Sequence, residues 1–463
     1  MRSLRASFVV ASIAIALFGL GRFLFNLVAV RIFGPDFVGG VNVSLSSWTV
    51  VAILLGTVPG FVTSKFVAES TARGDDGRAG RVFSAALASV VVPGIVIALS
   101  SMALRPGAAA TWAWYVPVFG AYLVIKAAAF AFGTQRSYLA AEVSGFAVFA
   151  TVCGLGCLLR SARIAELSLL LQPATIVMVG AWGLRDRLAW HGVAEEVATG
   201  WRDYGTFWGA IFVNAAAGLV SYHMAVVLAG AILDDRAQVG YLSVLLSSLA
   251  PLNFVPAALG TSLFPEIARR YGVGDEVGQR RTVTGSVLAL QALVLSAGTA
   301  LLLGPEPFLR LMHVPADGPV RTTWILLAWV LQLTIVSSPC GHFLNATRYA
   351  GRHAIASLVF LAIGLAMGVA GFVWVGLVGA GLMRIGVDAG LAWVRMIMAE
   401  KSLHWAREVR GAVLSCQVSL AVAMIAGLIA PAWPWRLAVW AAGFTSQIPA
   451  LLRAFSRLPT APV

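Results

Sequence analysis

Charged side chains are scarce in this chain of 463 residues. They make up 11% of the sequence, whereas a soluble domain carries about 25%, and 59% of the residues are hydrophobic. A soluble globular protein is therefore excluded, because so few charges could not cover its surface. The apolar runs are long and continuous, which also argues against a strand barrel. The sequence predicts an all-α polytopic membrane protein.

Cysteine is also scarce, with four residues, and every one falls inside an apolar segment. This placement predicts neither a disulfide framework nor a metal site. The sequence also lacks a nucleotide-binding motif, and the longest predicted outer loop, near residues 305–321, is short. A membrane glycan polymerase or ligase usually needs a larger outer loop with catalytic side chains. We therefore expect no enzyme and no bound cofactor.

Apolar sequence is abundant, and it divides into fourteen segments that are each long enough to cross a bilayer as a helix. Two six-helix lobes followed by two further helices account for them. We expect a first lobe at 1–183, a connector at 184–203, a second lobe at 204–400 and the two additional helices at 401–463. The predicted spans lie near 7–33, 41–66, 82–104, 111–134, 139–159, 164–183, 204–232, 237–263, 284–304, 322–346, 354–373, 376–398, 411–430 and 435–452.

Basic residues give the chain a net charge of +13, but they are spread through short loops and form no nucleic-acid-binding patch. With the N-terminus placed in the cytoplasm, 22 of the 33 basic residues fall on cytoplasmic segments and 8 on outer ones. Positive charge marks the cytoplasmic side of a membrane protein. We therefore predict a multi-pass protein of the bacterial cytoplasmic membrane, with both termini in the cytoplasm and no nucleic-acid partner.

The predicted connector, "LRDRLAWHGVAEEVATGWRD" at 184–203, contains Trp190 and Trp201. Charged residues and tryptophans in one segment are typical of an amphipathic element at a membrane surface. A plain polar loop is an equally good interpretation of the sequence.

Two stretches of the chain are alike. "VGGVNVSLSSW" at 38–48 and "VGYLSVLLSSL" at 239–249 agree at six of eleven positions, with an offset of 201 residues. Each opens the second span of its lobe, and an even number of spans separates them, so both should point the same way. Parallel repeats of this kind occur in transporters that bind their substrate between the halves. With this offset, the counterpart of Arg22 is His223.

Several polar side chains lie within predicted spans, where a central Arg costs roughly 2.5–3.5 kcal/mol. Arg22 and Asn26 are four residues apart and share a helix face, and neither Arg22 nor Lys126 has an acid three or four residues away. A cavity lined by cations favours an anionic substrate, because opposite charge replaces its lost hydration. The candidate substrate-binding residues are Arg22, Asn26, Lys126, Arg384 and His223.

Two acids within predicted spans are candidates for ion coupling, Glu142 in the fifth span and Asp388 in the twelfth. Asp388 lies one turn from Arg384, so the two could instead neutralise each other. The Glu142 carboxylate could instead reach the membrane surface, and His223 could be a packing residue. These alternatives stay open on the sequence alone.

The span pattern, six plus six with a parallel repeat and two extra helices, resembles the multidrug/oligosaccharidyl-lipid/polysaccharide exporter superfamily. "RIFGPDFVG" at 31–39 is similar to its first outer turn, and "GTVPGFVTSKFVAE" at 56–69 to its Gly-rich second span, with Lys65 where Arg is usual. "QVGYLSV" at 238–244 and "LFPEIARR" at 263–270 are similar to the second-lobe equivalents. The resemblance covers essentially the whole chain.

Within this superfamily, the chain resembles the polysaccharide and O-antigen flippases better than the drug exporters. Drug-extruding members typically carry an acid in the first helix, where this chain has Arg22 and Asn26. The resemblance implies alternating-access transport of a polyprenyl-diphosphate-linked oligosaccharide for exopolysaccharide or O-antigen synthesis. It also implies membrane lipids, a glycan polymerase and glycosyltransferases as partners. A peptidoglycan lipid-precursor flippase and a cation-coupled multidrug antiporter stay open as alternatives.

Overall fold

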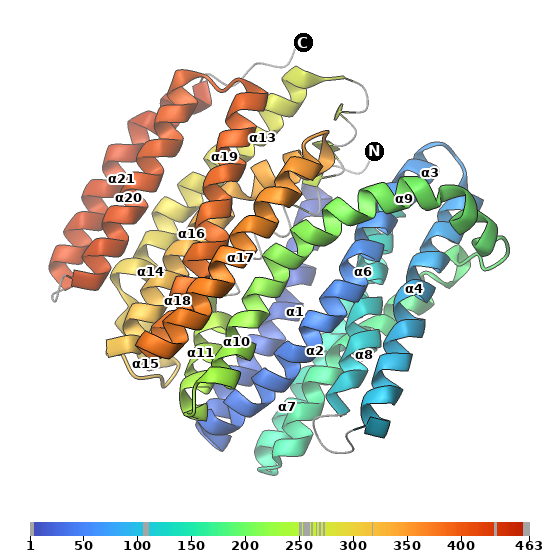
Figure 1. The fold of residues 1–463 in the computed structure, drawn as a ribbon, viewed down its shortest axis with the longest axis horizontal. Helices are drawn as coiled ribbons and strands as arrows, with labels where there is room; N and C mark the ends of the chain where they lie inside the picture. The colour runs from blue at the N-terminus through green and yellow to red at the C-terminus, as the bar shows by residue number, and fades with distance from the viewer. Residues whose placement is uncertain are drawn as a thin grey trace. The chain divides into compact units, whose positions relative to one another are not determined.

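The computed structural model of the protein is helical throughout the part that it describes (Figure 1). It describes residues 4–104, 111–249, 252, 260, 263–264, 266–267, 270–271, 274–316, 318–429 and 433–456, and no strand occurs among them. The chain divides into two compact units, Met1–Phe254 and Val255–Val463. The two units are described separately below.

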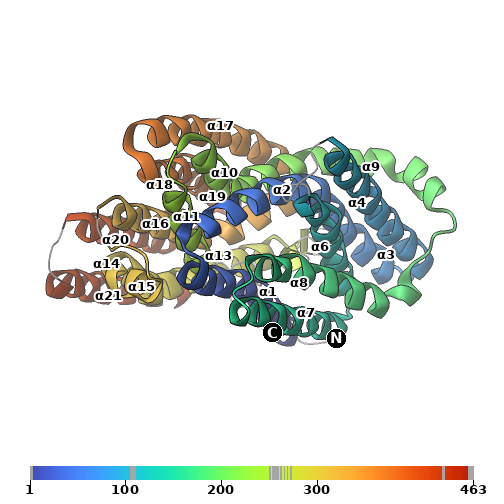
Figure 2. The same ribbon diagram turned by 90° about the horizontal axis from the view of Figure 1, so that it is seen from below.

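The first unit is a bundle of long helices in which α7 packs along α8, α1 along α7, and α2 along both α6 and α11 (Figures 1 and 2). Short 3-10 or π segments interrupt the longer helices. In chain order the elements are α1 (Leu4–Phe33), α2 (Pro35–Val62), η1 (Thr63–Val67), α3 (Ala68–Ala72), α4 (Asp76–Leu104), η2 (Trp112–Trp114), α6 (Tyr115–Ala131), α7 (Gln135–Leu158), α8 (Ala162–Gly183), η3 (Arg185–Arg187), α9 (Val193–Ala215), η4 (Ala216–Val220), α10 (Ser221–Ile232) and α11 (Arg236–Leu249).

The second unit is built around α16, the most deeply buried of its long helices. α16 packs against α13, α18, α19 and α20, and α20 pairs with α21 (Figure 1). The elements are α13 (Glu276–Leu293), η6 (Val294–Gly298), α14 (Thr299–Leu303), α15 (Pro305–Leu311), α16 (Gly318–Ala346), α17 (Ala350–Val375), η7 (Gly376–Val378), α18 (Gly379–Arg384), η8 (Ile385–Ala389), α19 (Gly390–Leu403), α20 (Arg407–Ile429) and α21 (Trp433–Ser456).

The polytopic membrane fold predicted from the sequence is confirmed. Each of the fourteen predicted spans falls on helix, although the eighth is described as a continuous helix only as far as Leu249. Among the described residues, nine helical segments are long and apolar enough to cross a membrane. One of these segments, Ala350–Leu403, contains the eleventh and twelfth predicted spans together. The chain is therefore a multi-pass membrane protein.

A glycine turn separates the eleventh and twelfth spans. The sequence has no charged residue here to mark the boundary, but α17 ends at Val375 and Gly376 adopts a positive φ of 58°. Such a φ is readily available only to glycine. Beyond the turn, α18 returns along α17 so closely that a Cβ on Gly379 would lie 2.3 Å from the Phe372 nitrogen. Glycine therefore sets both the turn and the close packing of this hairpin.

The two similar stretches meet in the first unit, where α2 packs along α11. A Cβ on Gly39 would lie 3.0 Å from the Gly240 nitrogen, and a Cβ on Gly240 would lie 2.1 Å from the Pro35 oxygen. Gly39 and Gly240 are equivalent positions of the repeat, and both lie in the first turns of their helices. The helices therefore cross at matching points close to their starts.

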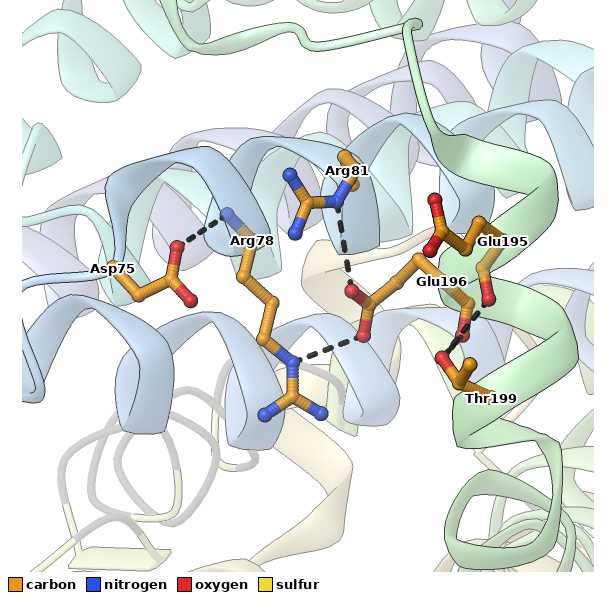
Figure 3. A network of polar contacts seen from close by, with 6 residues as sticks. All are labelled: Asp75, Arg78, Arg81, Glu195, Glu196 and Thr199. Carbon is orange, nitrogen blue, oxygen red and sulfur yellow. Dashed lines mark hydrogen bonds and ion pairs between the residues drawn. The ribbon is translucent and has the colours of Figure 1, made fainter.

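The predicted connector is only partly a loop. It contains η3 and a short loop, and α9 then begins at Val193 and continues without interruption into the predicted seventh span. Glu196 of α9 accepts from Arg78 of α4 at 2.9 Å and lies 3.6 Å from Arg81 (Figure 3). The Ala189 amide also donates to Ser84 at 3.0 Å. The connector is thus attached to the start of α4, while its position at a membrane surface stays a prediction.

Candidate functional site

The first candidate site is a polar cluster on α1, α2 and α10 in the interior of the first unit, which we call the Arg22 cluster. Its members are Arg22, Asn26, Asn42, Ser46 and His223. Asn26, Asn42, Ser46 and His223 are buried, with at most 8% of their surface exposed, whereas Arg22 is half-buried. Three of the predicted site residues therefore lie together.

Arg22 is held only by neutral side chains. Its Nη2 donates to Asn42 Oδ1 and to Ser46 Oγ, each at 3.2 Å. Within the described part of the chain it forms no other hydrogen bond and no ion pair. A guanidinium carries five N–H donors, so Nε and Nη1 keep their hydrogen-bonding capacity. Arg22 is thus positioned by the protein without being neutralised by it.

Asn42 fixes the orientation of Asn26. Asn42 Nδ2 donates to Asn26 Oδ1 at 2.8 Å and to the Val38 carbonyl at 2.9 Å. The Asn26 Nδ2 group is buried and has no hydrogen-bond partner in the structure. A buried amide donor without an acceptor costs free energy. It is therefore well suited to donate to an anion that also approaches Arg22.

The repeat counterparts Arg22 and His223 share one hydroxyl. His223 Nδ1 lies 3.4 Å from Ser46 Oγ, the same atom that accepts from Arg22. The direction of the His223 contact depends on the imidazole tautomer. Ser46 itself belongs to the first copy of the repeat. The offset of the repeat thus relates two residues, on α1 and α10, that both contact Ser46 of α2.

The second candidate site lies between α6 and α7 and contains Lys126, Glu142, Tyr122 and Tyr138. Glu142 is completely buried, and its Oε1 accepts a hydrogen bond from the Tyr138 hydroxyl. Its Oε2 has no hydrogen-bond partner. The alternative in which Glu142 reaches the membrane surface does not fit this burial. Glu142 is instead an interior carboxylate.

Lys126 interacts electrostatically with Glu142, but it forms no ion pair or hydrogen bond with any described residue. Its side chain lies deep among protein atoms, although part of its surface is accessible. An unpaired ammonium is costly in a dry interior, so Lys126 is either hydrated or uncharged there.

An aromatic ladder connects the surroundings of Arg22 to those of Glu142. Tyr115, which lies within electrostatic range of Arg22, stacks on Phe119 at 5.1 Å between ring centroids. Phe119 stacks on Tyr122 at 5.5 Å, and Phe18 of α1 stacks on Tyr122 at 4.5 Å. Rings in these geometries hold one another in place. The ladder therefore links α1 to α6 through Phe18.

Arg384 and Asp388 lie apart from these clusters, in the second unit. Arg384 Nε is 2.9 Å from Asp388 Oδ2, and both side chains are buried. Asp388 belongs to the π segment η8, and it also interacts electrostatically with Arg395 on α19. This geometry favours mutual neutralisation, the alternative that the sequence left open. A substrate-binding role for Arg384 and a coupling role for Asp388 stay predictions.

Other residues of these clusters were missed by the sequence analysis. Asn42 and Ser46 are four residues apart in an apolar helix, the same spacing that drew attention to Arg22 and Asn26. Both lie within the repeat motif "VGGVNVSLSSW", where Ser46 is identical in the second copy and Ser243 stands opposite Asn42. Tyr138 lies four residues before Glu142, and that spacing could have identified it as a hydrogen-bond donor. No comparable signal in the sequence pointed to Tyr122.

Comparison with known proteins gives structural matches and no sequence matches. No family model matches the chain, and no curated protein matches it. The MATE multidrug transporter DinF-BH has a TM-score of 0.70 at 13% identity, over 87% of this chain and 96% of its own. The lipid II flippase MurJ, in an inward closed conformation, has a TM-score of 0.61 at 9% identity, over 97% and 100%. The eukaryotic MATE transporter AtDTX14 has a TM-score of 0.58 at 14% identity, over 88% and 98%.

These neighbours agree with the fold that the sequence led us to expect. MATE transporters and MurJ both belong to the multidrug/oligosaccharidyl-lipid/polysaccharide exporter superfamily. The chain therefore shares the fold of these transporters and of MurJ over most of its length. At these low identities the similarity concerns the fold alone.

Proposed function

We propose that this protein is a flippase that moves an anionic, polyprenyl-diphosphate-linked oligosaccharide across the membrane by alternating access. The observation that carries the proposal is Arg22, a cation within an apolar helix whose partners are all neutral. A mid-membrane Arg is costly and normally has a charged partner or a watery surrounding. A transported anion would supply the missing charge during each cycle.

The chemistry of the cluster supports a diphosphate. Guanidinium groups bind phosphate oxygens through charge-assisted hydrogen bonds, and Arg22 Nε and Nη1, which lie on different edges of the group, are available for one each. The unsatisfied Asn26 Nδ2 adds a neutral donor beside them. Lys126, which forms no ion pair or hydrogen bond with any described residue, adds a second basic side chain in the same unit.

Reconstitution tests the proposal directly. The full-length protein is placed in liposomes with a fluorescent polyprenyl-diphosphate oligosaccharide, and a membrane-impermeant quencher reports the lipid that has crossed. We expect Arg22→Gln to reduce the rate at least tenfold, because it removes the charge and the guanidinium donors together. Arg22→Lys should retain part of the rate, since it keeps only the charge. Arg31→Gln is the matched control, because Arg31 lies at the exposed end of the same helix.

Normal transport by Arg22→Gln would overturn the proposal. The same liposomes loaded with a peptidoglycan lipid precursor distinguish the two flippase alternatives, because both substrates carry the diphosphate and differ in the glycan. Faster transport of the peptidoglycan precursor would identify that lipid, and not the polyprenyl-diphosphate oligosaccharide, as the substrate. The role of the Arg22 cluster would be unchanged in that case.

A cation-coupled multidrug antiporter is the second candidate, and the burial of Glu142 favours it. A carboxylate with no exposed surface and one unsatisfied oxygen can bind a proton or a cation. Under this alternative, a deletion strain becomes sensitive to cationic dyes and its surface glycan is unchanged. Glu142→Gln should then remove dye resistance while Arg22→Gln preserves it. The opposite pattern supports the flippase.

A further inference from the structure

A cavity of about 190 Å³ opens at one end of the second unit. The start of α13, the turn between α16 and α17, and the end of α19 form its walls, and Phe343 and Leu403 supply an apolar part of the lining. A water molecule occupies about 30 Å³ of liquid, so the cavity has room for a phosphoryl group and its ester linkage. On the predicted topology this end faces the cytoplasm.

Three arginines surround the cavity. Arg280 and Arg348 line it, and Arg352 joins Arg348 and Tyr349 in an adjoining depression. Within the described part of the chain, none of the three forms an ion pair, and the Arg280 Nε is buried without a hydrogen-bond partner. Neighbouring arginines at the same end are neutralised. Arg270 pairs with Glu266 at 2.6 Å and Arg410 with Glu400 at 3.2 Å.

Tyr349 lies between the cationic groups. Arg348 Nη2 donates to the Tyr349 hydroxyl at 3.2 Å, and the Arg348 guanidinium lies 5.3 Å from the centre of the Tyr349 ring. Hydrogen bonds from Ser402 and Arg348, together with the charges of Arg348 and Arg352, lower the pKa of this phenol below its ordinary value. The positive charges of Arg348 and Arg352 favour the ionised form of the phenol. The same charges would stabilise any other anion in this depression.

One acid opposes this field. Glu276 lines the cavity from the first turn of α13 and acts electrostatically on Arg348, but it lies farther away than an ion pair. Glu276, Arg348 and Arg352 are all exposed, whereas Arg280 is half-buried, and exposed charges interact weakly across water. The three cations therefore still outweigh the one acid.

We propose that this cavity binds a phosphate-bearing anion, with Arg280, Arg348 and Arg352 as the binding residues. Two sources share this chemistry: the headgroup of an anionic membrane lipid and a soluble phosphorylated compound. Basic pockets at the ends of membrane helices commonly bind anionic headgroups. The exposed apolar side chains of Ile355 and Leu358 continue along α17 from Arg352 and offer a surface for acyl chains. These neighbours favour the lipid.

The test uses the full-length protein purified in a neutral detergent. Phosphatidylglycerol and inorganic phosphate are titrated separately, and binding is followed by thermal stabilisation and by native mass spectrometry. We expect phosphatidylglycerol to bind and the double variant Arg280→Gln/Arg348→Gln to lose roughly tenfold or more in affinity, because it removes two charge-assisted contacts. Glu276→Gln should bind more tightly, because it removes the opposing charge.

Arg407→Gln is the matched control, since Arg407 is exposed at the start of α20 and does not line the cavity. The affinity of the Arg407→Gln variant for phosphatidylglycerol should equal that of the unmodified protein. If inorganic phosphate binds, phosphatidylglycerol does not, and the double variant no longer binds phosphate, the anion site is supported. Its ligand is then a soluble phosphorylated compound and not a lipid headgroup. Binding of neither probe, or equal binding by all variants, would overturn the proposal. Unchanged melting without ligand shows that the variants are folded.

Discussion

Arg22 of α1 and Arg384 of α18 are both cations inside apolar helices, but the protein treats them differently. Arg384 has Asp388 one turn away at 2.9 Å, so its charge is balanced within its own segment. Arg22 has an asparagine and a serine from another helix, which orient the guanidinium and leave its charge unbalanced. The first arrangement is typical of structure and the second of ligand binding. Predictions that separate stability from transport test this distinction.

The largest effect on stability is expected from Asp388→Asn. Removing one partner of a buried ion pair leaves the other charge uncompensated and typically costs about 3–5 kcal/mol of unfolding free energy. Thermal unfolding of the purified protein in detergent measures the loss. The double variant Arg384→Met/Asp388→Leu is the control, because an apolar pair of similar size should recover most of the stability. A single variant as stable as the unmodified protein would show that the pair is not structural.

Arg22→Gln should change stability much less and transport much more. Removing the cation from an apolar span is favourable by roughly 2.5–3.5 kcal/mol. That gain offsets two lost hydrogen bonds, so we expect a net loss of at most about 2 kcal/mol. The same melting experiment, run beside the liposome assay, gives both values. A stability loss as large as that of Asp388→Asn would show that Arg22 has a structural role, as Arg384 and Asp388 do.

Glu142→Gln is expected to reduce stability no more than Arg22→Gln does, because Lys126 and Glu142 interact without forming an ion pair. The amide keeps the hydrogen bond from Tyr138 and removes the charge, so we expect a loss of about 1–2 kcal/mol. A double-mutant cycle with Lys126→Met measures the coupling, which should exceed about 0.5 kcal/mol for interacting neighbours. Strict additivity would show that the two charges act independently.

The smallest effect is expected from Glu306, which joins α15 to Arg321 of α16 at 3.1 Å and to Arg436 of α21 at 2.6 Å. Partial burial raises the pKa of this carboxyl, but the hydrogen bond from Arg436 and the charges of both arginines outweigh it and place the pKa below its usual 4.5. A depressed pKa gives stability that is complete above 4.5 and is lost as the pH falls through the lower folded value.

Thermal unfolding across this pH range, for the unmodified protein and Glu306→Gln, measures the contribution. The difference should be at most about 1 kcal/mol, should vanish in acid and should shrink at high salt, because the group is partly exposed. A difference that is independent of pH would mean that packing, and not charge, holds α21 at this point.

The helices were predictable because their cause is local. Apolar runs of sufficient length satisfy backbone hydrogen bonds within the segment, so the fourteen predicted spans fall on helix wherever the structure describes them. The turn at Gly376 was poorly defined by the sequence, because no charged residue marks it. The continuity of α9 through the connector was not predicted, since its polar first turns resemble a loop until Glu196 meets Arg78.

The candidate site was predictable in part. A charge in an apolar segment is conspicuous, so Arg22, Lys126, Glu142, Arg384 and Asp388 were all identified as unusual. Their partners on other helices were not, because spacing along the chain constrains neighbours only within one helix. Only Arg384 and Asp388, which share a helical turn, could be paired in advance.

The sequence by itself determined that this is a helical, multi-pass membrane protein with a repeated element and charges buried inside it. Composition and hydropathy decide these properties, and both act over a single segment. The tertiary structure alone decided which charges are balanced. Asp388 reaches Arg384 within one helix, whereas Arg22 meets Asn42 and Ser46 only because α1 packs on α2, and electrostatic satisfaction depends on distances in space.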